Sequence, residues 1–197
     1  MVPFYKKKIR QPSQKRLPEV LSHEQVQRLL KAVESPVHGA CFALMYACGL
    51  RISEAQYLTI PNIDGKKGLL RIIGKGNKER VVPLPTPMLA SLRSLWQLHR
   101  HPRLIFPNLQ GERPVSTCVL YRTFRDAQKQ AGLPATITPH TLRHSYATRL
   151  MENRVDIRVV QILLGHENID STTIYTHLTE PTRQSLRNLL DHVMVDL

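Results

Sequence analysis

The chain has few acidic residues for its size. Of its 197 residues, 15 are Asp or Glu and 28 are Lys or Arg, so the formal net charge is +13. This excess makes a polyanionic partner the first hypothesis. The alternative is that the charge only keeps the protein in solution, since net charge alone does not identify a ligand. Aromatic residues are also scarce, at 6%, which argues against an RNA-binding module built on aromatic platforms.

Cysteines are too few for a disulfide framework and lack the spacing of a zinc site. Cys41 and Cys48 lie seven residues apart in an apolar stretch, on one face of an expected helix. We expect both to be reduced core residues. His140 and His144 have helical spacing, but the glutamate of a His-Glu-x-x-His zinc motif is missing. The sequence therefore indicates no metal site.

Long hydrophobic runs are absent. The longest apolar run, 40–50, has 11 residues, whereas a helix needs about 20 to cross a bilayer. The N-terminus is basic but lacks the apolar core of a secretory signal. These absences predict a cytoplasmic protein with no membrane partner, associated with the nucleoid if it binds DNA.

The N-terminal segment differs in composition from the rest. The stretch KKKIRQPSQKR at 6–16 has six basic residues and no acidic one, so it offers little apolar surface to bury. We expect a flexible basic arm over 1–16, which either follows DNA phosphates or is only a solubilising tail. Its expected DNA contacts are Lys6, Lys7, Lys8, Arg10, Lys15 and Arg16. The remainder, 17–197, is long enough for a single globular domain.

Helical signals begin after the arm. Ser22 and Gln25 have capping-box spacing, and the apolar stripe that follows ends at Ser35-Pro36. Residues 38–48 are apolar all round, as in a buried helix, and Gly49 suits the left-handed conformation that ends one. Arg51 is therefore expected just beyond a rigid, buried element.

In the segment 58–84, the hydrophobic pattern changes from one typical of helices to one typical of strands. Short β-branched runs are separated by Asp-Gly and Gly-Lys-Gly-Asn turn signals, which predicts a three-stranded antiparallel sheet. Lys75 lies in the second hairpin turn. Lys66, Lys67 and Lys78 are alternatives for a functional lysine here, but we expect them to contact phosphates or solvent.

Helical patterns resume after the sheet. We expect helices over 86–98, 116–131, 139–152, 157–164 and 182–195, with Thr86, Thr138 and Asp156 as caps and Gly132, Asn153 and Gly165 as stops. Asp170 can cap a short helix that holds Tyr175. The predicted fold class is α+β, mainly α-helical, with a small three-stranded antiparallel sheet.

Several residues in this frame suit phosphodiester cleavage without a metal. Two guanidinium groups, for which Arg51 and Arg143 are candidates, can grip the non-bridging oxygens. A tyrosine nucleophile forms a phosphoester that conserves bond energy. Because the phenol has a pKa of about 10, it must be activated by its surroundings. His140 and Arg143 are three residues apart, so on one helix they face the same way.

Five motifs give these residues a common identity. In chain order they are CGLRISE, GKGNKERVVPL, HTLRHSYAT, LLGH and TTIYTH. In this order they resemble the catalytic domain of the tyrosine recombinases, the phage integrase family, over about 17–179. The resemblance implies that family's catalytic-domain fold and a site-specific recombinase or integrase that cleaves and rejoins DNA through a 3′-phosphotyrosyl intermediate.

The resemblance also implies roles for individual residues. Tyr175 would attack the scissile phosphate, held by Arg51 and Arg143. Lys75 would protonate the leaving 5′ oxygen, His140 would assist proton transfer, and His166 would hydrogen-bond the phosphate. Glu54 would orient the arginines, while Lys78 and Arg80 are further expected DNA contacts. No cofactor is expected, and the partners would be double-stranded DNA and three further copies, as a homotetramer on paired sites.

Alternatives remain open at this point. Tyr146 is the second candidate nucleophile; with Tyr46, Tyr57 and Tyr121 it is otherwise expected in the core or an interface. The other histidines are expected on the surface: His23, His38, His99, His101 and His192. A type IB topoisomerase would use the same chemistry, and a non-catalytic DNA-binding accessory protein would share the charge.

Family members usually carry a helical core-binding domain of about one hundred residues ahead of this region, as the resemblance implies. Here we expect none, because only the basic arm precedes the region of resemblance, which begins at about residue 17. The chain would then be either a natural single-domain recombinase, like the fimbrial inversion enzymes, or part of a longer integrase.

Overall fold

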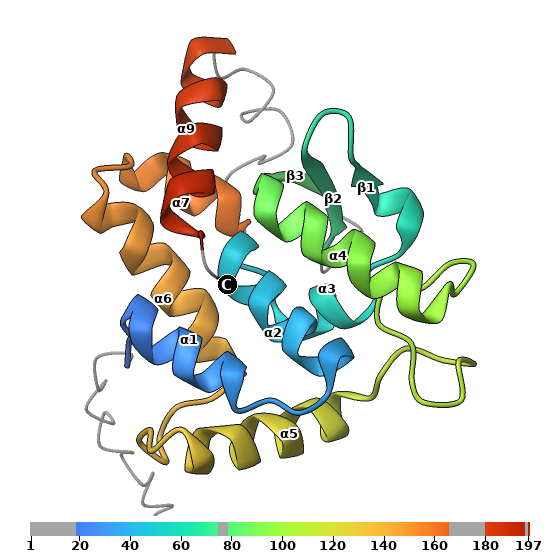
Figure 1. Cartoon of the computed structure of the whole chain (residues 1–197). Helices are drawn as coiled ribbons and strands as arrows, with labels where there is room; N and C mark the ends of the chain where they lie inside the picture. The colour runs from blue at the N-terminus through green and yellow to red at the C-terminus, as the bar shows by residue number, and fades with distance from the viewer. Residues whose placement is uncertain (1–18, 75–78, 166–179, 196) are drawn as a thin grey trace, which may run out of the picture.

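The computed structural model describes residues 19–74, 79–165, 180–195 and 197 (Figure 1). It is mainly helical with one small antiparallel sheet, which confirms the predicted fold class. The described helices are α1 (His23–Lys31), α2 (Pro36–Cys48), α3 (Ile52–Gln56), the 3-10 turn η1 (Ile60–Asn62), α4 (Thr86–His99), α5 (Thr117–Gln130), α6 (Pro139–Glu152), α7 (Ile157–Leu164) and α9 (Glu180–Val193). The strands are β1 (Ile63–Asp64), β2 (Leu69–Ile73) and β3 (Glu79–Pro83). Within the described ranges, no helix has the length and apolar character needed to cross a membrane.

Helix α1 begins with the predicted capping box. The Ser22 hydroxyl accepts from the Gln25 backbone N–H at 3.2 Å, and the Gln25 side chain accepts from the Ser22 N–H at 2.8 Å. Ser35-Pro36 was predicted to end this helix, and that prediction was wrong. Ser35 instead caps α2, with Pro36 in its first turn, because proline at a helix start costs no hydrogen bond.

Helix α2 forms the centre of the core and contacts α1, α3, α4 and α6. Its residues from Cys41 to Cys48 are all buried, and both thiols are free, as predicted. Gly49 ends the helix at φ 62°. A Cβ on Gly49 would lie 2.5 Å from Cδ1 of Tyr146, so the close approach of α6 also requires a glycine here. This tight junction fixes the start of the Arg51 segment.

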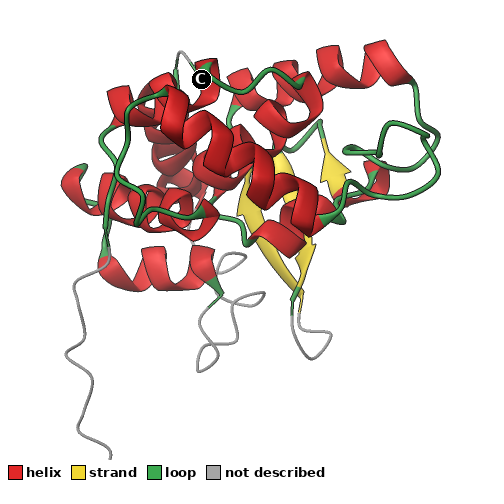
Figure 2. Cartoon of the chain, turned by 90° about the horizontal axis from the view of Figure 1, so that it is seen from below, coloured by secondary structure: helices red, strands yellow, loops and turns green. Residues whose placement is uncertain are grey.

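The sheet has the order β1-β2-β3, with all pairs antiparallel, as predicted (Figure 2). Leu70 pairs with Val82 and Ile72 with Arg80, and these four residues form the buried face. That face packs on the end of α2, where the Cys48 thiol donates to the carbonyl of Pro83 at 3.6 Å. The opposite face is partly open to solvent: Arg71 and Ile73 are exposed on it, whereas Pro83 is buried.

Two predicted cap or stop residues are displaced by one residue, and α9 spans Glu180–Val193 rather than 182–195. The cap of α4 is Pro85 rather than Thr86, and the Thr86 N–H donates to the Asp191 carboxylate of α9 at 2.7 Å. Asn153, predicted to be left-handed, has φ −88°, and the left-handed residue is Arg154 at φ 61°. In both cases the helix itself is confirmed, and the shift is one residue, because several neighbouring residues can end or cap a turn.

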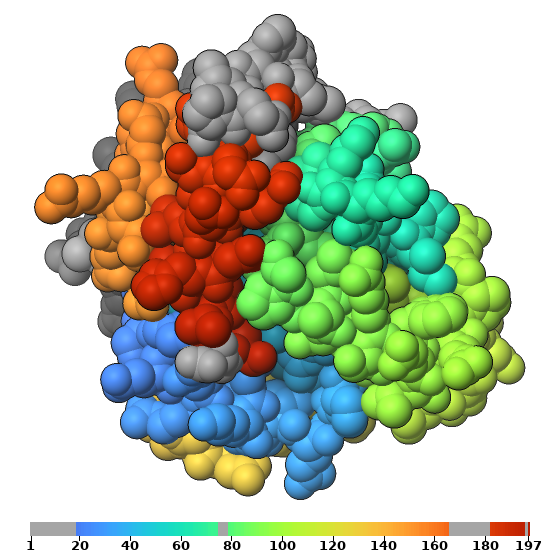
Figure 3. Space-filling view, turned by 45° about the horizontal axis from the view of Figure 1, so that its top comes forward, coloured from blue at the N-terminus to red at the C-terminus, as the bar shows by residue number. Residues whose placement is uncertain are grey.

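Helix α9 packs on the domain that precedes it. Leu186, Leu190 and Val193 are buried in the common core, at the helical spacing the sequence predicted. Figure 3 shows α9, in red, among α1, α4 and the α6–α7 region. The Arg187 guanidinium also donates to the carbonyl of Lys67 at 2.8 Å, which links α9 to the β1–β2 turn.

Candidate active site

Arg51 and Arg143, far apart in sequence, lie together in the structure. Arg51 immediately precedes α3, and its side chain is 40% exposed. Arg143 lies in α6 with only 10% of its side chain exposed. Its guanidinium donates to the carbonyls of Gly49 at 2.6 Å and Leu164 at 2.5 Å. Arg143 is therefore held rigidly between the ends of α2 and α7, whereas Arg51 reaches toward solvent.

Glu54 joins the two arginines. Its carboxylate accepts from Nη1 of Arg51 at 2.9 Å and from the Arg51 backbone N–H at 2.8 Å. Nη1 of Arg143 lies 3.8 Å from Oε2 of the same carboxylate, which is 5% exposed. The structure thus brings together Arg51, Glu54 and Arg143, which the motifs had grouped, and the carboxylate of Glu54 is buried beside the two guanidinium groups.

The charge of this cluster favours an anion. Burial alone would raise the pKa of Glu54, but the hydrogen bonds and charge of Arg80 and the bonds from Arg51 outweigh it and lower the pKa from 4.5 to about 2. Burial, and then the charge of Arg51, lower the pKa of Arg143 to about 10, so it stays protonated at neutral pH. Three guanidinium groups surround one carboxylate, which leaves a net charge of +2. The single negative charge of a DNA phosphodiester would offset part of this excess, and the further charge of a transition state would offset more.

Arg80 was expected to contact DNA, and the structure contradicts that expectation. Arg80 is only 3% exposed, and its guanidinium donates to both carboxylate oxygens of Glu54 at 2.7 Å. The alternation of side chains between the two faces of a strand could have indicated that Arg80 is buried, since Arg80 shares a face with the buried Val82. A charged residue at that register needs a buried partner.

The two histidines of α6 are exposed near its N-terminus. His140 is the second residue of the helix, three residues before Arg143, as the motif requires. Burial, the charge of Arg143 and that of His140 lower the pKa of His144, which favours its neutral form at pH 7. Across the ranges that the structure describes, no group of three His, Cys, Asp or Glu side chains is placed to hold a metal ion.

The alternative nucleophile is poorly placed. Tyr146 is fully buried, with its ring against Gly49. Tyr46 is also buried, which raises its pKa to about 12. Tyr57 and Tyr121 are 62% and 38% exposed, so of the two expected locations, core or interface, the core is excluded for both. Of these four tyrosines, Tyr57 is exposed and lines the pocket that Arg51 and Glu54 also line.

Most other predicted site residues lie outside the described ranges. Lys75 falls between the ends of β2 and β3, and His166 follows Gly165 directly. Also outside are Tyr175, Lys78 and the arm residues Lys6, Lys7, Lys8, Arg10, Lys15 and Arg16. The alternative lysines, Lys66 and Lys67, lie in the β1–β2 turn, at the other end of β2 from Gly74.

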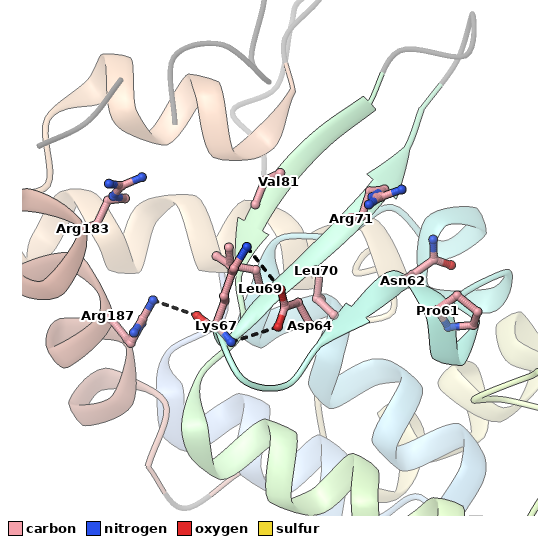
Figure 4. Close-up of a pocket in the computed structure, with 10 residues that line it drawn as sticks. All are labelled: Pro61, Asn62, Asp64, Lys67, Leu69, Leu70, Arg71, Val81, Arg183 and Arg187. Carbon is pink, nitrogen blue, oxygen red and sulfur yellow. Dashed lines mark hydrogen bonds and ion pairs between the residues drawn. The ribbon is translucent and has the colours of Figure 1, made fainter. Parts of the chain in front are cut away.

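Arg71 is a residue of this region that the sequence reasoning missed. A pocket of about 550 Å³ lies beside Arg51 and Glu54 and is also lined by Asn62 and Arg71. A second pocket, of about 580 Å³, shares Asn62 and Arg71 and continues along the open face of the sheet toward Arg187 (Figure 4). The signal was the alternation in LLRII, which places Arg71 on the face opposite Leu70.

Four histidines expected on the surface are instead partly buried and hydrogen-bonded. His23 lies 3.2 Å from both the Tyr46 hydroxyl and the carbonyl of Val195. The other bonded histidines are His38, with Thr123; His99, with the carbonyl of Ile105; and His101, with the backbone N–H groups of Arg103 and Leu104. His192 is exposed, as expected.

Comparison with known proteins agrees with this geometry. Residues 19–181 match the model of the phage integrase family. Tyrosine recombinase XerD of Staphylococcus aureus is 35% identical over 187 residues, which cover 88% of this chain and 63% of the relative. This chain therefore spans less than two thirds of that relative's length.

Solved structures have the same architecture. The integrase of mycobacterium phage Brujita aligns with a TM-score of 0.71 at 27% identity, over 91% of this chain and 59% of that one. The XerH site-specific recombinase bound to difH substrate, in a pre-cleavage complex, aligns with a TM-score of 0.68 at 27% identity, over 87% of this chain and 54% of that one. Sequence, fold and the arrangement of Arg51, Glu54 and Arg143 agree, and the chain belongs to the phage integrase family.

Proposed function

We propose that this chain is the catalytic part of a site-specific DNA recombinase, which cleaves and rejoins DNA through a 3′-phosphotyrosyl intermediate. The observation that carries the proposal is the convergence of Arg51 and Arg143 on Glu54 in a cluster with net positive charge. Such a cluster is suited to a phosphate whose negative charge increases in the transition state. We also propose a basic arm over 1–16 and a catalytic domain over 17–197, in which all five motifs lie.

The two arginines would hold the scissile phosphate from different sides. The bonds of Arg143 to two backbone carbonyls fix its orientation before DNA arrives, so little reorganisation is needed on binding. Arg51 uses Nη1 for Glu54, and its partly exposed guanidinium has further N–H groups for a non-bridging oxygen. Together they would supply the charge that a metal ion supplies in other nucleases.

The remaining steps are assigned to residues outside the described ranges and to His140. The phenol oxygen of Tyr175 would attack phosphorus while its proton leaves with the help of His140. The bond from phosphorus to the 5′ oxygen would break, and Lys75 would protonate that oxygen. His166 would hydrogen-bond the phosphate. Rejoining is the reverse reaction, so neither a cofactor nor external energy is needed.

Double-stranded DNA is the proposed substrate. The net charge of +13 supports it, as does the similarity to XerH, whose structure contains its difH substrate. We further propose that four copies assemble on paired sites, and that Lys78 and the basic arm contact phosphates. A protein with this substrate would work at the nucleoid, in the cytoplasm.

The proposal is tested by trapping the covalent intermediate. A duplex from the DNA flanking the gene, nicked so that the cleaved fragment diffuses away, should become attached to the protein through its 3′ phosphate. EDTA should not prevent attachment, because the arginines supply the positive charge. Tyr175→Phe should form no adduct while its DNA affinity stays within about threefold, since only the nucleophilic oxygen is lost.

Tyr146→Phe is the matched control and should still form the adduct, because Tyr146 is buried in the core. An adduct that persists in Tyr175→Phe, or that requires a divalent metal, would contradict the mechanism. Relaxation of a supercoiled plasmid without the flanking DNA would favour a type IB topoisomerase. Specific binding without any adduct would favour a non-catalytic accessory protein.

A further inference from the structure

We propose that Arg80 is a positioning residue for the arginine clamp: it occupies Glu54 so that Arg51 is oriented and Arg143 stays available to the phosphate. This inference rests on the proposed function. It assigns to Arg80 a role that differs from DNA contact, and the contacts of Glu54 define that role.

The pairing of Arg80 with Glu54 is bidentate and buried. Nη1 donates to Oε1 and Nη2 to Oε2, each at 2.7 Å, and the two side chains are 4% and 5% exposed. Parallel bonds of this kind fix the plane of a carboxylate as well as its position. Because Arg80 belongs to β3 and pairs in register with Ile72, the sheet determines where Glu54 can lie.

Arg80 also binds the end of α7. Its Nε donates to the carbonyl of Leu163 at 3.1 Å, while Arg143 binds the next carbonyl, that of Leu164, at 2.5 Å. Two cations thus satisfy consecutive carbonyls at the negative end of one helix. A Cβ on Gly165 would lie 2.8 Å from Cδ of Arg80, so the chain leaves α7 directly against this side chain.

The hydrogen bonds of Glu54 show what Arg80 prevents. Its carboxylate accepts four hydrogen bonds, two from Arg80 and two from Arg51. An ionised carboxylate has about four acceptor positions, so this one is saturated. Arg143 accordingly remains at 3.8 Å from Oε2, an ion-pair distance beyond that of a hydrogen bond.

Loss of Arg80 would leave two acceptor positions of a buried carboxylate unpaired. Arg51 already donates to Glu54, so Arg143 is the cation in the cluster that still lacks a hydrogen bond to it. An unpaired buried charge is costly, so Glu54 and Arg143 would move together. That movement would turn the Arg143 fork away from the phosphate and free Arg51 to change rotamer. Arg80 therefore acts on the reaction through Glu54 without touching the DNA.

Substitution at Arg80 tests this role. On the nicked duplex, Arg80→Gln should lower the single-turnover rate of adduct formation by about tenfold or more, as expected for a misplaced oxyanion donor. DNA affinity and its salt dependence should change by less than about threefold, because no phosphate contact is lost. Arg80→Lys keeps the charge but not the fork, so its rate should lie between those of the wild type and Arg80→Gln.

Arg93→Gln is the matched control. Arg93 lies in α4 and is exposed. Its replacement by glutamine removes the same charge as Arg80→Gln. Its rate of adduct formation should equal that of the wild type. Rates are normalised to the amplitude of adduct formed, so that a smaller folded fraction does not count as slower chemistry. If Arg80→Gln fails to fold, the comparison of Arg80→Lys with the wild type carries the test.

A double-mutant cycle with Glu54→Gln distinguishes positioning from simple stabilisation. If Arg80 acts through Glu54, the double variant should be no slower than the slower single variant. Rate effects that multiply independently would overturn the inference. So would a wild-type rate in Arg80→Gln, or a loss of rate matched by a lower salt slope of DNA binding. Absence of an adduct in the wild type would instead overturn the proposed function.

Discussion

Arg51 and Arg143 reach the same carboxylate but are held very differently. Arg143 bonds two backbone carbonyls and is 10% exposed at its side chain, whereas the Arg51 side chain is 40% exposed. The buried arginine is therefore part of the framework as well as a candidate ligand for phosphate. Its replacement by lysine is not conservative, since an ammonium group cannot reproduce the planar fork.

Arg143→Lys should lower the cleavage rate by about a hundredfold or more, close to the effect of Arg143→Ala. The carbonyls of Gly49 and Leu164 accept from two different nitrogens of Arg143, and an ammonium group has its donors on a single nitrogen. Single-turnover adduct formation measures the rate, and near-UV circular dichroism checks that the core is intact. Cleavage by Arg143→Lys at the wild-type rate would show that Arg143 does not hold the phosphate.

The depressed pKa of Glu54 links this cluster to acid stability. Its pKa is about 2 in the folded chain against 4.5 for an ordinary glutamate, so ionised Glu54 stabilises the fold above pH 4.5. That contribution is lost as the pH falls from 4.5 toward 2. Glu54→Gln should lower the free energy of unfolding at pH 7 by about 3–5 kcal/mol, because Arg80 stays buried without its partner.

Urea unfolding of the wild type and Glu54→Gln at a series of pH values measures this linkage. The difference in the free energy of unfolding between the two proteins should be constant from pH 7 down to about 5 and should become smaller below that pH. Thr136→Ala is a control outside the cluster, since its hydroxyl bonds only the exposed Glu19 among the described residues. A difference that does not depend on pH would show that Glu54 is not the titrating group.

At the scale of elements, the junction between α2 and α3 sets the position of the clamp. Gly49 provides the left-handed turn, the close contact with Tyr146 and the carbonyl that Arg143 binds. Arg51 follows two residues later as the cap of α3. A single glycine thus combines a backbone requirement, a packing requirement and a hydrogen bond for the site.

Gly49→Ala should lower the free energy of unfolding by about 2–5 kcal/mol, the sum of a left-handed penalty and the overpacking of a tight contact. Gly132→Ala is the matched control: its φ is 65°, but a Cβ there meets nothing within 4 Å. It should cost only the backbone penalty, about 1–2 kcal/mol. Equal costs for the two variants would show that the contact with Tyr146 is not tight.

At the scale of the whole molecule, the basic residues fall into two groups, those buried near Glu54 and those in the N-terminal arm. Arg80 and Arg143 are buried in the domain, whereas the six basic residues of the arm have no acidic neighbour in sequence. Charges that contact phosphates release counterions from DNA, and buried charges paired with a carboxylate do not. The salt dependence of DNA binding can therefore separate the two groups.

Deletion of 1–16 should reduce the slope of log affinity against log salt by about 3–4 units, if about four of its cations contact phosphates at about 0.9 each. Replacement of the six basic residues by glutamine, at unchanged arm length, is the control that separates charge from chain. Fluorescence anisotropy over a range of salt concentrations measures the slope. An unchanged slope in both variants would mean that the arm is only a solubilising tail.

The sequence by itself determined most of the local structure and the family. Capping residues, proline at helix starts and the two hydrophobic periods depend on neighbouring residues, so the start of α1, the bounds of α5 and α7 and the order of the strands were predictable. The order of the five motifs identified the family, and placed Arg51, Glu54 and Arg143 as one group. Errors at Ser35 and Asn153 arose where one residue type can either end or begin a turn.

Only the tertiary structure decided which charges are paired and which are open. Arg80 lies 26 residues from Glu54 in sequence, and no local pattern names that partner. The same holds for the bonded histidines and the contact of α9 with the rest of the described core. Charge and hydrogen-bonding capacity are properties of a residue, but burial and partner are properties of the packed chain. A basic residue in a DNA-binding motif therefore becomes a ligand for phosphate or a support for that ligand only when the chain folds.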